Sequence, residues 1–341
     1  MSDPAVVIMS CAGAPCRPII PSRQPTVRPA LPGHQEIAMS RRRSFRQALK
    51  RAVAERRLLV VPGAYDALSA LLIERTGFDT MFVGGFPVAG ARYGVPDIGL
   101  KGFADIAAAV RDILAACDVP VLVDIDDGYG DVKNAVHTVQ SYERMGASAV
   151  FLEDQAWPKR CGHMAGKKVV PAEIMEAKIR ATMAERLDAE TLICVRTDAR
   201  AVLGFDEALR RAERYINAGA EAIFVEAPES IDELERLARS FDVPQFANPL
   251  VGGRTPILSP KEFEQLGFNA ICFGLETIMH AAKAMKMVLE DMRAGTFALR
   301  DQGMGFEEFK ALVHYDRWDR IDNVYGRPEN LQPTTAASHS S

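Results

Sequence analysis

The sequence has few cysteines for its length and no pattern that would organise them. Its six cysteines are scattered over 341 residues, which excludes a small disulfide-stabilised scaffold. Cys161 and His163 stand two positions apart, but no second Cys/His pair lies at zinc-finger spacing, which argues against a zinc site. Scattered cysteines are typical of reducing compartments, and we therefore expect a cytoplasmic protein.

The chain also lacks an excess of positive charge and any long hydrophobic run. A net charge of −4 and a pI of about 5.9 exclude the electrostatic footprint of a nucleic-acid or anionic-lipid binder. We expect the one basic cluster, Arg41–Arg43 with Arg46, Lys50 and Arg51, to form a solvated helix face. No apolar run is long enough for a membrane span, and the N-terminus does not resemble a secretory signal. We expect neither a nucleic-acid partner nor a membrane partner.

The two ends of the chain differ in composition from the middle. Residues 1–40 are rich in Pro, Ser and Ala without periodicity, and residues 327–341 are polar. Segments of this kind bury too little apolar surface to fold. We predict a disordered extension over 1–40, a folded domain over 41–326 and a disordered tail over 327–341.

One short pattern occurs four times and predicts the architecture. Each copy starts with a Gly that follows an amphipathic run, as a glycine at a helix C-terminus does, and then continues into a short apolar strand. The copies are GFDTMFVG (77–84), GASAVFLE (146–153), GAEAIFVE (219–226) and GFNAICFG (267–274). Four further apolar strands are expected between them, at 58–63, 119–126, 192–198 and 243–249.

Amphipathic helical patterns separate most of these strands. The patterns cover 102–117, 132–144, 172–186, 206–218 and 231–240. Apolar strands that alternate with helices indicate a parallel sheet covered by helices, and eight such units in roughly 250 residues predict an α/β protein of the (β/α)8 TIM-barrel type. The alternative is an open doubly wound sheet, but no G-x-G-x-x-G motif follows the first strand. Residues 306–325 add C-terminal helices whose aromatic residues suggest docking on the barrel or on a neighbouring subunit.

Polar residues follow the predicted strands at the end where such barrels place their active sites. A single residue of this kind often caps a helix or pairs locally. Five successive strands that deliver such residues to one rim indicate a site instead. From the second strand's loop to the seventh strand, these residues are Asp97, Asp124, Asp126, Glu153, Arg196, Glu226 and Asn248.

The carboxylates of this rim suggest a hard metal ion. Asp124 and Asp126 are two positions apart, so in a regular strand they share one side. With Glu153 they form an oxygen-rich set that suits Mg²⁺, with Mn²⁺ as an alternative. Two readings of Arg196 remain open, because its guanidinium suits a substrate carboxylate but equally a structural ion pair with a neighbouring acid. Asn248 could donate to a substrate carboxylate or simply turn the chain.

Residues 159–163 bring three kinds of chemistry together. Lys159 and Arg160 are cationic, and neighbouring cations favour the thiolate of Cys161. Gly162 permits a tight bend, and His163 could orient a ligand or exchange protons. The alternative is a solvated basic turn with an incidental cysteine.

The segment PKRCGHMAGK (158–167) resembles the signature loop of the isocitrate lyase/phosphoenolpyruvate mutase superfamily. Within it, the segment is most similar to the branch of 2-methylisocitrate lyase, 2,3-dimethylmalate lyase and oxaloacetate hydrolase. Further matching motifs occur in order between residues 45 and 325: PGAYDALSA (62–70), GVPDIG (94–99), VDIDDGYG (123–130), EDQ (153–155), VRTD (195–198) and NPLVGGRTP (248–256). The resemblance implies a Mg²⁺-dependent barrel that forms a homotetramer with helix exchange at the eighth unit.

The resemblance also implies roles for residues of the site. A Mg²⁺ ion would be surrounded, mostly through water, by Asp97, Asp124, Asp126 and Glu153. Cys161 would be the acid–base residue on a mobile loop, and the catalytic set would also contain Lys159, His163, Arg196 and Glu226. The substrate-binding set would consist of Gly84, Gly85, Phe86, Gly162, Arg196, Asn248 and Thr255.

The implied reaction is cleavage of a carbon–carbon bond in a 2-hydroxy dicarboxylate. A retro-aldol (Claisen-type) step on an acid of the 2,3-dimethylmalate or 2-methylisocitrate type would give pyruvate or glyoxylate and a second carboxylic acid, protonated by Cys161. One alternative is an oxaloacetate hydrolase or decarboxylase at the same site. Another is a catalytically weakened relative that binds 2-oxo acids. In each case the expected partner is a small 2-hydroxy or 2-oxo acid.

Four positions depart from the family pattern. Gly84 replaces a Ser or Thr, and Phe82 stands where methylisocitrate lyases often have Tyr, so the base that takes the hydroxyl proton is not assigned. Met164 stands where those enzymes carry Arg, which weakens the case for a tricarboxylate substrate. Gly274 replaces a Pro or Ser at a position that varies with substrate.

Overall fold

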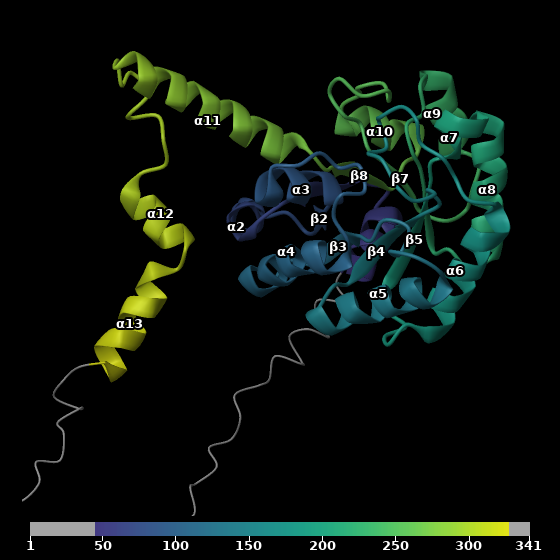
Figure 1. The fold of residues 1–341 in the computed structure, drawn as a ribbon, viewed down its shortest axis with the longest axis horizontal. Helices are drawn as coiled ribbons and strands as arrows, with labels where there is room; N and C mark the ends of the chain where they lie inside the picture. The colour runs from purple at the N-terminus through teal and green to yellow at the C-terminus, as the bar shows by residue number, and fades with distance from the viewer. Residues whose placement is uncertain (1–44, 327–341) are drawn as a thin grey trace, which may run out of the picture.

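The computed structural model describes residues 45–326, which contain a closed barrel of eight parallel strands (Figure 1). Strand neighbours follow chain order, and the eighth strand closes on the first. The strands are β1 (Leu59–Ala64), β2 (Met81–Val83), β3 (Val121–Asp124), β4 (Ala149–Glu153), β5 (Leu192–Thr197), β6 (Ala222–Val225), β7 (Gln245–Ala247) and β8 (Ala270–Phe273). The predicted (β/α)8 barrel is confirmed. The predictions for residues 1–40 and 327–341 lie outside the described residues.

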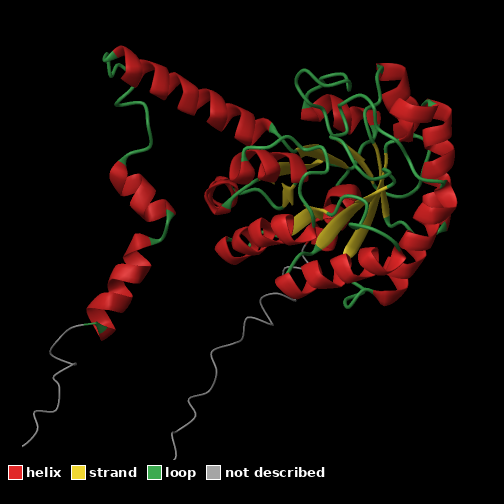
Figure 2. Cartoon of the chain, viewed as in Figure 1, coloured by secondary structure: helices red, strands yellow, loops and turns green. Residues whose placement is uncertain are grey.

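Helices surround the barrel, and further helices follow it (Figure 2). They are α2 (Ala67–Thr76), α3 (Gly85–Tyr93), α4 (Phe103–Ala116), α5 (Val132–Met145), α6 (Ala172–Glu185), α7 (Ala199–Leu203), α8 (Phe205–Asn217), α9 (Ile231–Ala238), α10 (Pro260–Leu266), α11 (Glu276–Ala294), α12 (Phe306–Leu312) and α13 (Tyr315–Tyr325). None of the described helices is long and apolar enough to cross a bilayer.

The repeated glycines end helices as the sequence predicts. Gly77, Gly146, Gly219 and Gly267 have φ angles of 86°, 103°, 115° and 106°. This left-handed conformation strains any residue with a Cβ, so glycine stops each helix and turns the chain into the next strand.

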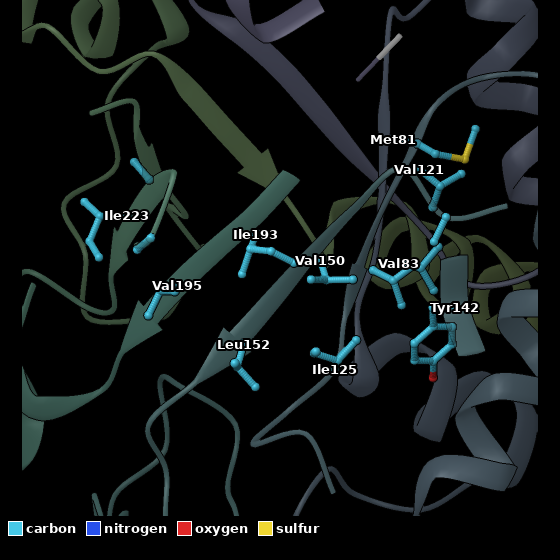
Figure 3. Close-up of a cluster of buried hydrophobic side chains, with 14 of the residues drawn as sticks. Met81, Val83, Val121, Ile125, Tyr142, Val150, Leu152, Ile193, Val195 and Ile223 are labelled. Carbon is cyan, nitrogen blue, oxygen red and sulfur yellow. The ribbon is translucent and has the colours of Figure 1, made fainter. Parts of the chain in front are cut away.

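Side chains alternate between two buried layers along each strand. In β4, Val150 and Leu152 belong to the layer between sheet and helices (Figure 3). Phe151, between them, belongs to the cluster inside the barrel. The Phe151 ring lies 5.3 Å from that of Phe224 and 5.2 Å from that of Phe246, measured between centroids. This aromatic layer fills the barrel beneath the strand ends that carry the polar residues.

A helix over residues 45–54 covers the opposite end of the barrel. Phe45 and Leu49 are buried in the same interior cluster as the first residues of several strands. Arg46 is not solvated as expected, because its Nη2 atom is 2.8 Å from both carboxylate oxygens of Glu221. The expectation holds for Lys50, which is exposed.

The helix after the eighth strand leaves the barrel instead of covering it (Figure 1). Neither α11 nor α13 has a buried residue. An apolar groove therefore remains beside β1 and α2, lined by residues that include Pro62, Leu72, Ile73 and Phe273. The C-terminal helices are confirmed, and they expose apolar surface that one chain does not cover.

Replacing Phe45 by Ala tests whether the first helix closes the barrel. We expect the free energy of unfolding to fall by about 3–5 kcal/mol, because a fully buried ring is lost from the interior. Urea unfolding measures the change. Lys50→Ala, on the exposed face of the same helix, should alter stability by no more than about 0.5 kcal/mol. Equal stability of the two variants would contradict the role of the helix.

Candidate active site

Most of the predicted site residues surround one cavity at the C-terminal end of the barrel, with a volume of about 50 Å³. The cavity is lined by Gly84, Gly85, Phe86, Asp97, Asp124, Lys159, Cys161, Gly162, His163, Arg196, Glu226 and Asn248, among others. Asp126, Glu153 and Thr255 are buried but do not line it. The Thr255 hydroxyl has no hydrogen-bond partner among residues 45–326.

The cavity is covered by the loop that follows β4. Gln155 and Val169 form an antiparallel bridge that ties the two limbs of this loop together at its base. The Gln155 side chain exchanges hydrogen bonds of 2.8 and 2.9 Å with the backbone of Arg160. The residues between these limbs, 156–168, are called the covering loop below. Lys159 in this loop is only 5% exposed, so the alternative of a solvated basic turn is wrong for this residue, whereas Arg160 is exposed.

Lys159 lies between two carboxylates of the rim. Its Nζ atom is 2.7 Å from Asp97 Oδ1 and 2.6 Å from Asp126 Oδ1. Burial opposes the charge of Lys159, but Asp126 and Asp97 outweigh it and hold its pKa well above the ordinary value. Burial raises the pKa of Asp126 to about 7; Asp124 and Asp97 add to the rise, and Lys159 opposes it. Negative charge at this point is therefore not fully compensated by the protein.

Arg196 is shared among three acids. Its Nε atom lies 2.9 Å from Asp198 Oδ2, 3.3 Å from Glu153 Oε2 and 3.4 Å from Glu226 Oε2. Its Nη2 atom donates a second hydrogen bond to Asp198 at 3.0 Å. Burial would raise the pKa of Asp198, but Arg196 and Lys167 outweigh it and lower that pKa to about 2. The ion pair considered from the sequence is present, and the guanidinium still lines the cavity.

The structure reverses the expected effect on Cys161. Burial raises the pKa of its thiol, and the carboxylates of Asp97 and Glu226 act in the same direction. Lys159, which was expected to favour the thiolate, is held by Asp97 and Asp126 instead. The thiol is thus kept protonated at neutral pH and is suited to donating a proton rather than attacking as a nucleophile.

His163 joins the covering loop to Arg254 and Glu226. Its Nδ1 atom accepts a hydrogen bond of 3.2 Å from the backbone N–H of Arg254. This assigns the proton to Nε2, which lies 3.1 Å from Glu226 Oε1 and 3.5 Å from Asn248 Nδ2. His163 therefore orients Glu226 at the edge of the cavity.

The acidic side of the site contains a buried carboxylate oxygen that no described residue pairs. Glu153 Oε1 is buried and accepts no hydrogen bond within the described part of the chain. A Cβ at Gly85 would lie 3.3 Å from Lys159 Nζ and 3.7 Å from Asp126 Oδ1, so glycine keeps this space clear. No three acidic, imidazole or thiol groups among residues 45–326 converge closely enough to bind one ion directly. Oxygen donors at longer range suit Mg²⁺, which retains several of its waters.

Three of the departures from the family pattern prove to be one arrangement. A Cβ at Gly84 would lie 2.9 Å from Cε1 of Phe82, and a Cβ at Gly274 would lie 3.2 Å from the same atom. The Phe82 ring therefore occupies the space that larger residues at 84 and 274 would need. The sequence showed the three substitutions but not that they depend on one another.

Two charged residues beside the site were not singled out as site residues from the sequence. Lys167 Nζ lies 2.7 Å from Asp198 Oδ1, although a lysine in a short polar loop usually faces solvent. Asp154 accepts hydrogen bonds from Thr197 Oγ1 at 2.7 Å and from the backbone of Asp198 at 2.8 Å, which fixes the end of β5. Neither spacing nor composition distinguishes these residues from solvated ones.

Comparison with known proteins places these features in a family. Residues 45–293 match the model of the phosphoenolpyruvate phosphomutase family. The chain is 36% identical over 282 residues to a 2,3-dimethylmalate lyase of Eubacterium barkeri, covering 81% of this chain and 96% of that protein. It is 39% identical over 280 residues to the petal death protein of Dianthus caryophyllus (81% and 88%). Identity to a 2-methylisocitrate lyase of Aeropyrum pernix is 37% over 281 residues (82% and 90%).

Solved structures agree with this assignment. Oxaloacetate acetylhydrolase in complex with 3,3-difluorooxalacetate superposes with a TM-score of 0.78 at 29% identity, covering 84% of this chain and 97% of that one. A 2,3-dimethylmalate lyase described as a PEP mutase/isocitrate lyase superfamily member superposes with a TM-score of 0.77 at 29% identity. The match covers 86% of this chain and 96% of that one. Phosphonopyruvate hydrolase in complex with oxalate and Mg²⁺ superposes with a TM-score of 0.74 at 29% identity, covering 83% of this chain and 100% of that one.

A double-mutant cycle tests the dependence of Gly84 on Phe82. Gly84→Ser should lower the free energy of unfolding by about 1–3 kcal/mol, because the new Cβ meets the ring. In a Phe82→Ala background, the same change should lower the free energy of unfolding by less than half as much. Urea unfolding of the wild type, the two single variants and the double variant measures the coupling.

Gly102→Ser is the control for this cycle. Gly102 precedes the first turn of α4 and has open space around its Cα, so serine there should be neutral or slightly stabilising. If Gly84→Ser lowered the free energy of unfolding equally in the presence and absence of the Phe82 ring, the proposed dependence of Gly84 on Phe82 would be wrong.

Proposed function

The chain belongs to the PEP mutase/isocitrate lyase superfamily, and we propose that it is a Mg²⁺-dependent lyase that cleaves a carbon–carbon bond in a 2-hydroxy dicarboxylate. The proposed substrate class is a C3-alkylated malate of the 2,3-dimethylmalate type, with a 2-methylisocitrate-type acid as the next candidate. The observation that carries the proposal is the position of Cys161 in a cavity that Arg196 and the acidic rim also line. Burial raises the pKa of its thiol, which suits a proton donor.

The proposed metal site consists of Asp97, Asp124, Asp126 and Glu153. Their oxygen-only donors and the unpaired Oε1 atom of Glu153 support a hard cation held partly through water. When bound, Mg²⁺ would polarise the oxygen on C2 of the substrate as a Lewis acid.

The protein's own groups would position the substrate on the other side of the cavity. Arg196 would pair with a carboxylate, since its guanidinium lines the cavity and can donate two parallel hydrogen bonds. Gly84 and Gly85 bring the N-terminus of α3 to the cavity, where backbone N–H groups and the helix dipole favour an anion. His163 and Asn248 would hold Glu226 and the second carboxylate in place.

The proposed bond cleavage transfers one proton away from the C2 hydroxyl and one proton to C3. As the C2–C3 bond breaks, C2 becomes a carbonyl and the bonding electrons move to the C3 fragment. Cys161 donates its proton to C3 of that fragment. Phe82 has no proton acceptor, so removal of the hydroxyl proton falls to a carboxylate of the rim. The covering loop would exclude water while the carbanion-like fragment exists.

The position of Met164 supports a dicarboxylate substrate. Met164 is exposed and does not line the cavity, so it offers nothing to a third carboxylate. This observation favours a branched dicarboxylate over a tricarboxylate.

An oxaloacetate hydrolase or decarboxylase is the second candidate. The similarity to the structure of oxaloacetate acetylhydrolase favours it. A catalytically weakened relative that only binds 2-oxo acids is a third candidate, motivated by Phe82 and Gly84.

We also propose that the protein is a homotetramer in which α11 is exchanged between copies. Met285, Leu289 and Met292 on α11 are more than half exposed in the single chain, at 59%, 64% and 51%. The groove beside β1 and α2 is apolar and lies where the eighth helix of a closed barrel would pack. A second copy's α11 fits this groove in character and position.

Products from a panel of acids distinguish the proposed functions. The protein is incubated with Mg²⁺ and 2,3-dimethylmalate, 2-methylisocitrate, isocitrate or oxaloacetate, and pyruvate, glyoxylate and oxalate are assayed. Pyruvate from the dimethylmalate is expected. Oxalate or loss of CO₂ from oxaloacetate alone would support the second candidate. No product from any acid, with oxalate still bound, would support the third.

Cys161→Ser tests the proton donor. Turnover should fall by at least about 100-fold, while oxalate binding changes by less than about threefold, because the thiol acts on the leaving fragment only. Cys117→Ser, at the end of α4 and outside the cavity lining, is the control and should retain activity. Turnover that survives Cys161→Ser would refute the acid role.

Sedimentation velocity of Leu289→Glu tests the assembly. A charge on the exposed apolar face of α11 should dissociate the tetramer, because it would be buried against the groove of another copy. Glu290→Gln, on the neighbouring position of the same helix, should leave the tetramer intact. A monomeric wild-type protein would contradict helix exchange.

A further inference from the structure

We propose that Lys167 is a positioning residue that holds the covering loop closed and compensates part of the negative charge around Arg196. It lies on the returning limb of the loop, outside the KRCGH segment (159–163) that carries the proposed chemistry. The inference deepens the proposed function, and it rests on that function only for its kinetic test.

Lys167 joins the loop to the barrel through two contacts. Its ammonium donates a hydrogen bond to the backbone carbonyl of Gly162, in the middle of the loop. It also donates a hydrogen bond of 2.7 Å to Asp198 Oδ1, at the end of β5. The side chains of Lys167 and Asp198 are 1% and 0% exposed, so this ion pair is fully removed from water. Breaking a buried pair leaves an uncompensated charge, which makes the contact a strong one.

The carbonyl that Lys167 binds belongs to the residue that seats the loop. A Cβ at Gly162 would lie 2.5 Å from both Arg196 Nη2 and Glu226 Cδ, so the Gly162 backbone packs directly against these two side chains. Cys161 and His163 flank Gly162 on either side. Lys167 thus fixes the short piece of backbone that aims the thiol and the imidazole into the cavity.

Lys167 also changes the charge balance around Arg196. Asp198 Oδ1 accepts hydrogen bonds from Lys167 and from Arg196 Nη2, the latter at 3.0 Å. Without Lys167, Arg196 would be the only cation paired with Asp198 while it also faces Glu153 and Glu226. With Lys167 in place, part of the negative charge of Asp198 is compensated. The guanidinium of Arg196 can then donate hydrogen bonds to a substrate carboxylate. Closing the loop therefore prepares Arg196 for the substrate.

Alkylation of Cys161 tests the loop without requiring turnover. Iodoacetamide modification is followed by mass spectrometry of the peptide that contains Cys161, so that the other cysteines do not interfere. Lys167→Met should accelerate modification at least about tenfold, because loss of a charged buried contact favours the open loop. Lys168→Met is the matched control, since Lys168 is the next residue and is exposed, and it should change the rate by less than about twofold. Equal rates in the two variants overturn the proposal.

Kinetics of the same variants test the effect on Arg196. With whichever acid the panel identifies as substrate, Lys167→Met should lower kcat at least about tenfold and raise KM, since both loop and guanidinium are displaced. Lys167→Arg keeps the charge and should recover part of the loss. A lower melting temperature with unchanged alkylation and kinetics would mean a merely structural role and would overturn the proposal.

The two readouts separate the failure of this inference from that of the proposed function. A protein without lyase activity still reports on the loop through Cys161. If Lys167→Met does not fold, Lys167→Gln, which keeps a hydrogen-bond donor, is measured by the same two methods against the same control.

Discussion

Compensation of buried negative charge is the constraint on which the site depends. The carboxylates buried at the mouth of the barrel include Asp97, Asp124, Asp126, Glu153, Asp198 and Glu226. An unpaired ion in such a place costs several kcal/mol, so the acids must be matched by cations. Arg196 is supplied by the barrel, whereas Lys159 and Lys167 arrive with the covering loop. We therefore propose that closing the loop and neutralising the site are one event, and that the remaining negative charge is matched by the proposed divalent cation.

The fold could be predicted from the sequence because local signals agreed with one another. Glycines that end helices recur before strands, and apolar strands alternate with amphipathic helices, which together define the barrel. The rim followed from the same argument, since polar residues at consecutive strand ends must meet. The electrostatic properties of single side chains could not be predicted, because they depend on which partner each side chain contacts in the fold. The pKa of Cys161 rises because the loop is buried, whereas its neighbours in the sequence suggested the opposite.

The same limit applies to the residues around Phe82 and to α11. Gly84 and Gly274 are far apart in the sequence, and only the barrel brings both against one ring. The path of α11 away from the barrel cannot be read from its amphipathic pattern, because this pattern does not show whether the apolar face packs on the helix's own barrel.

The acetylation rates of the loop lysines give the most direct test of whether the closed loop supplies the cations that compensate the buried acids. Acetylation rates of Lys159, Lys167 and the exposed Lys168 are compared by mass spectrometry in the wild type and in Gly162→Ala, whose new Cβ cannot fit beside Arg196. We expect Lys159 and Lys167 to react at least about tenfold more slowly than Lys168 in the wild type, and all three to react at similar rates in Gly162→Ala. Equal rates in the wild type, or continued protection of Lys159 and Lys167 in Gly162→Ala, would contradict this account of the site.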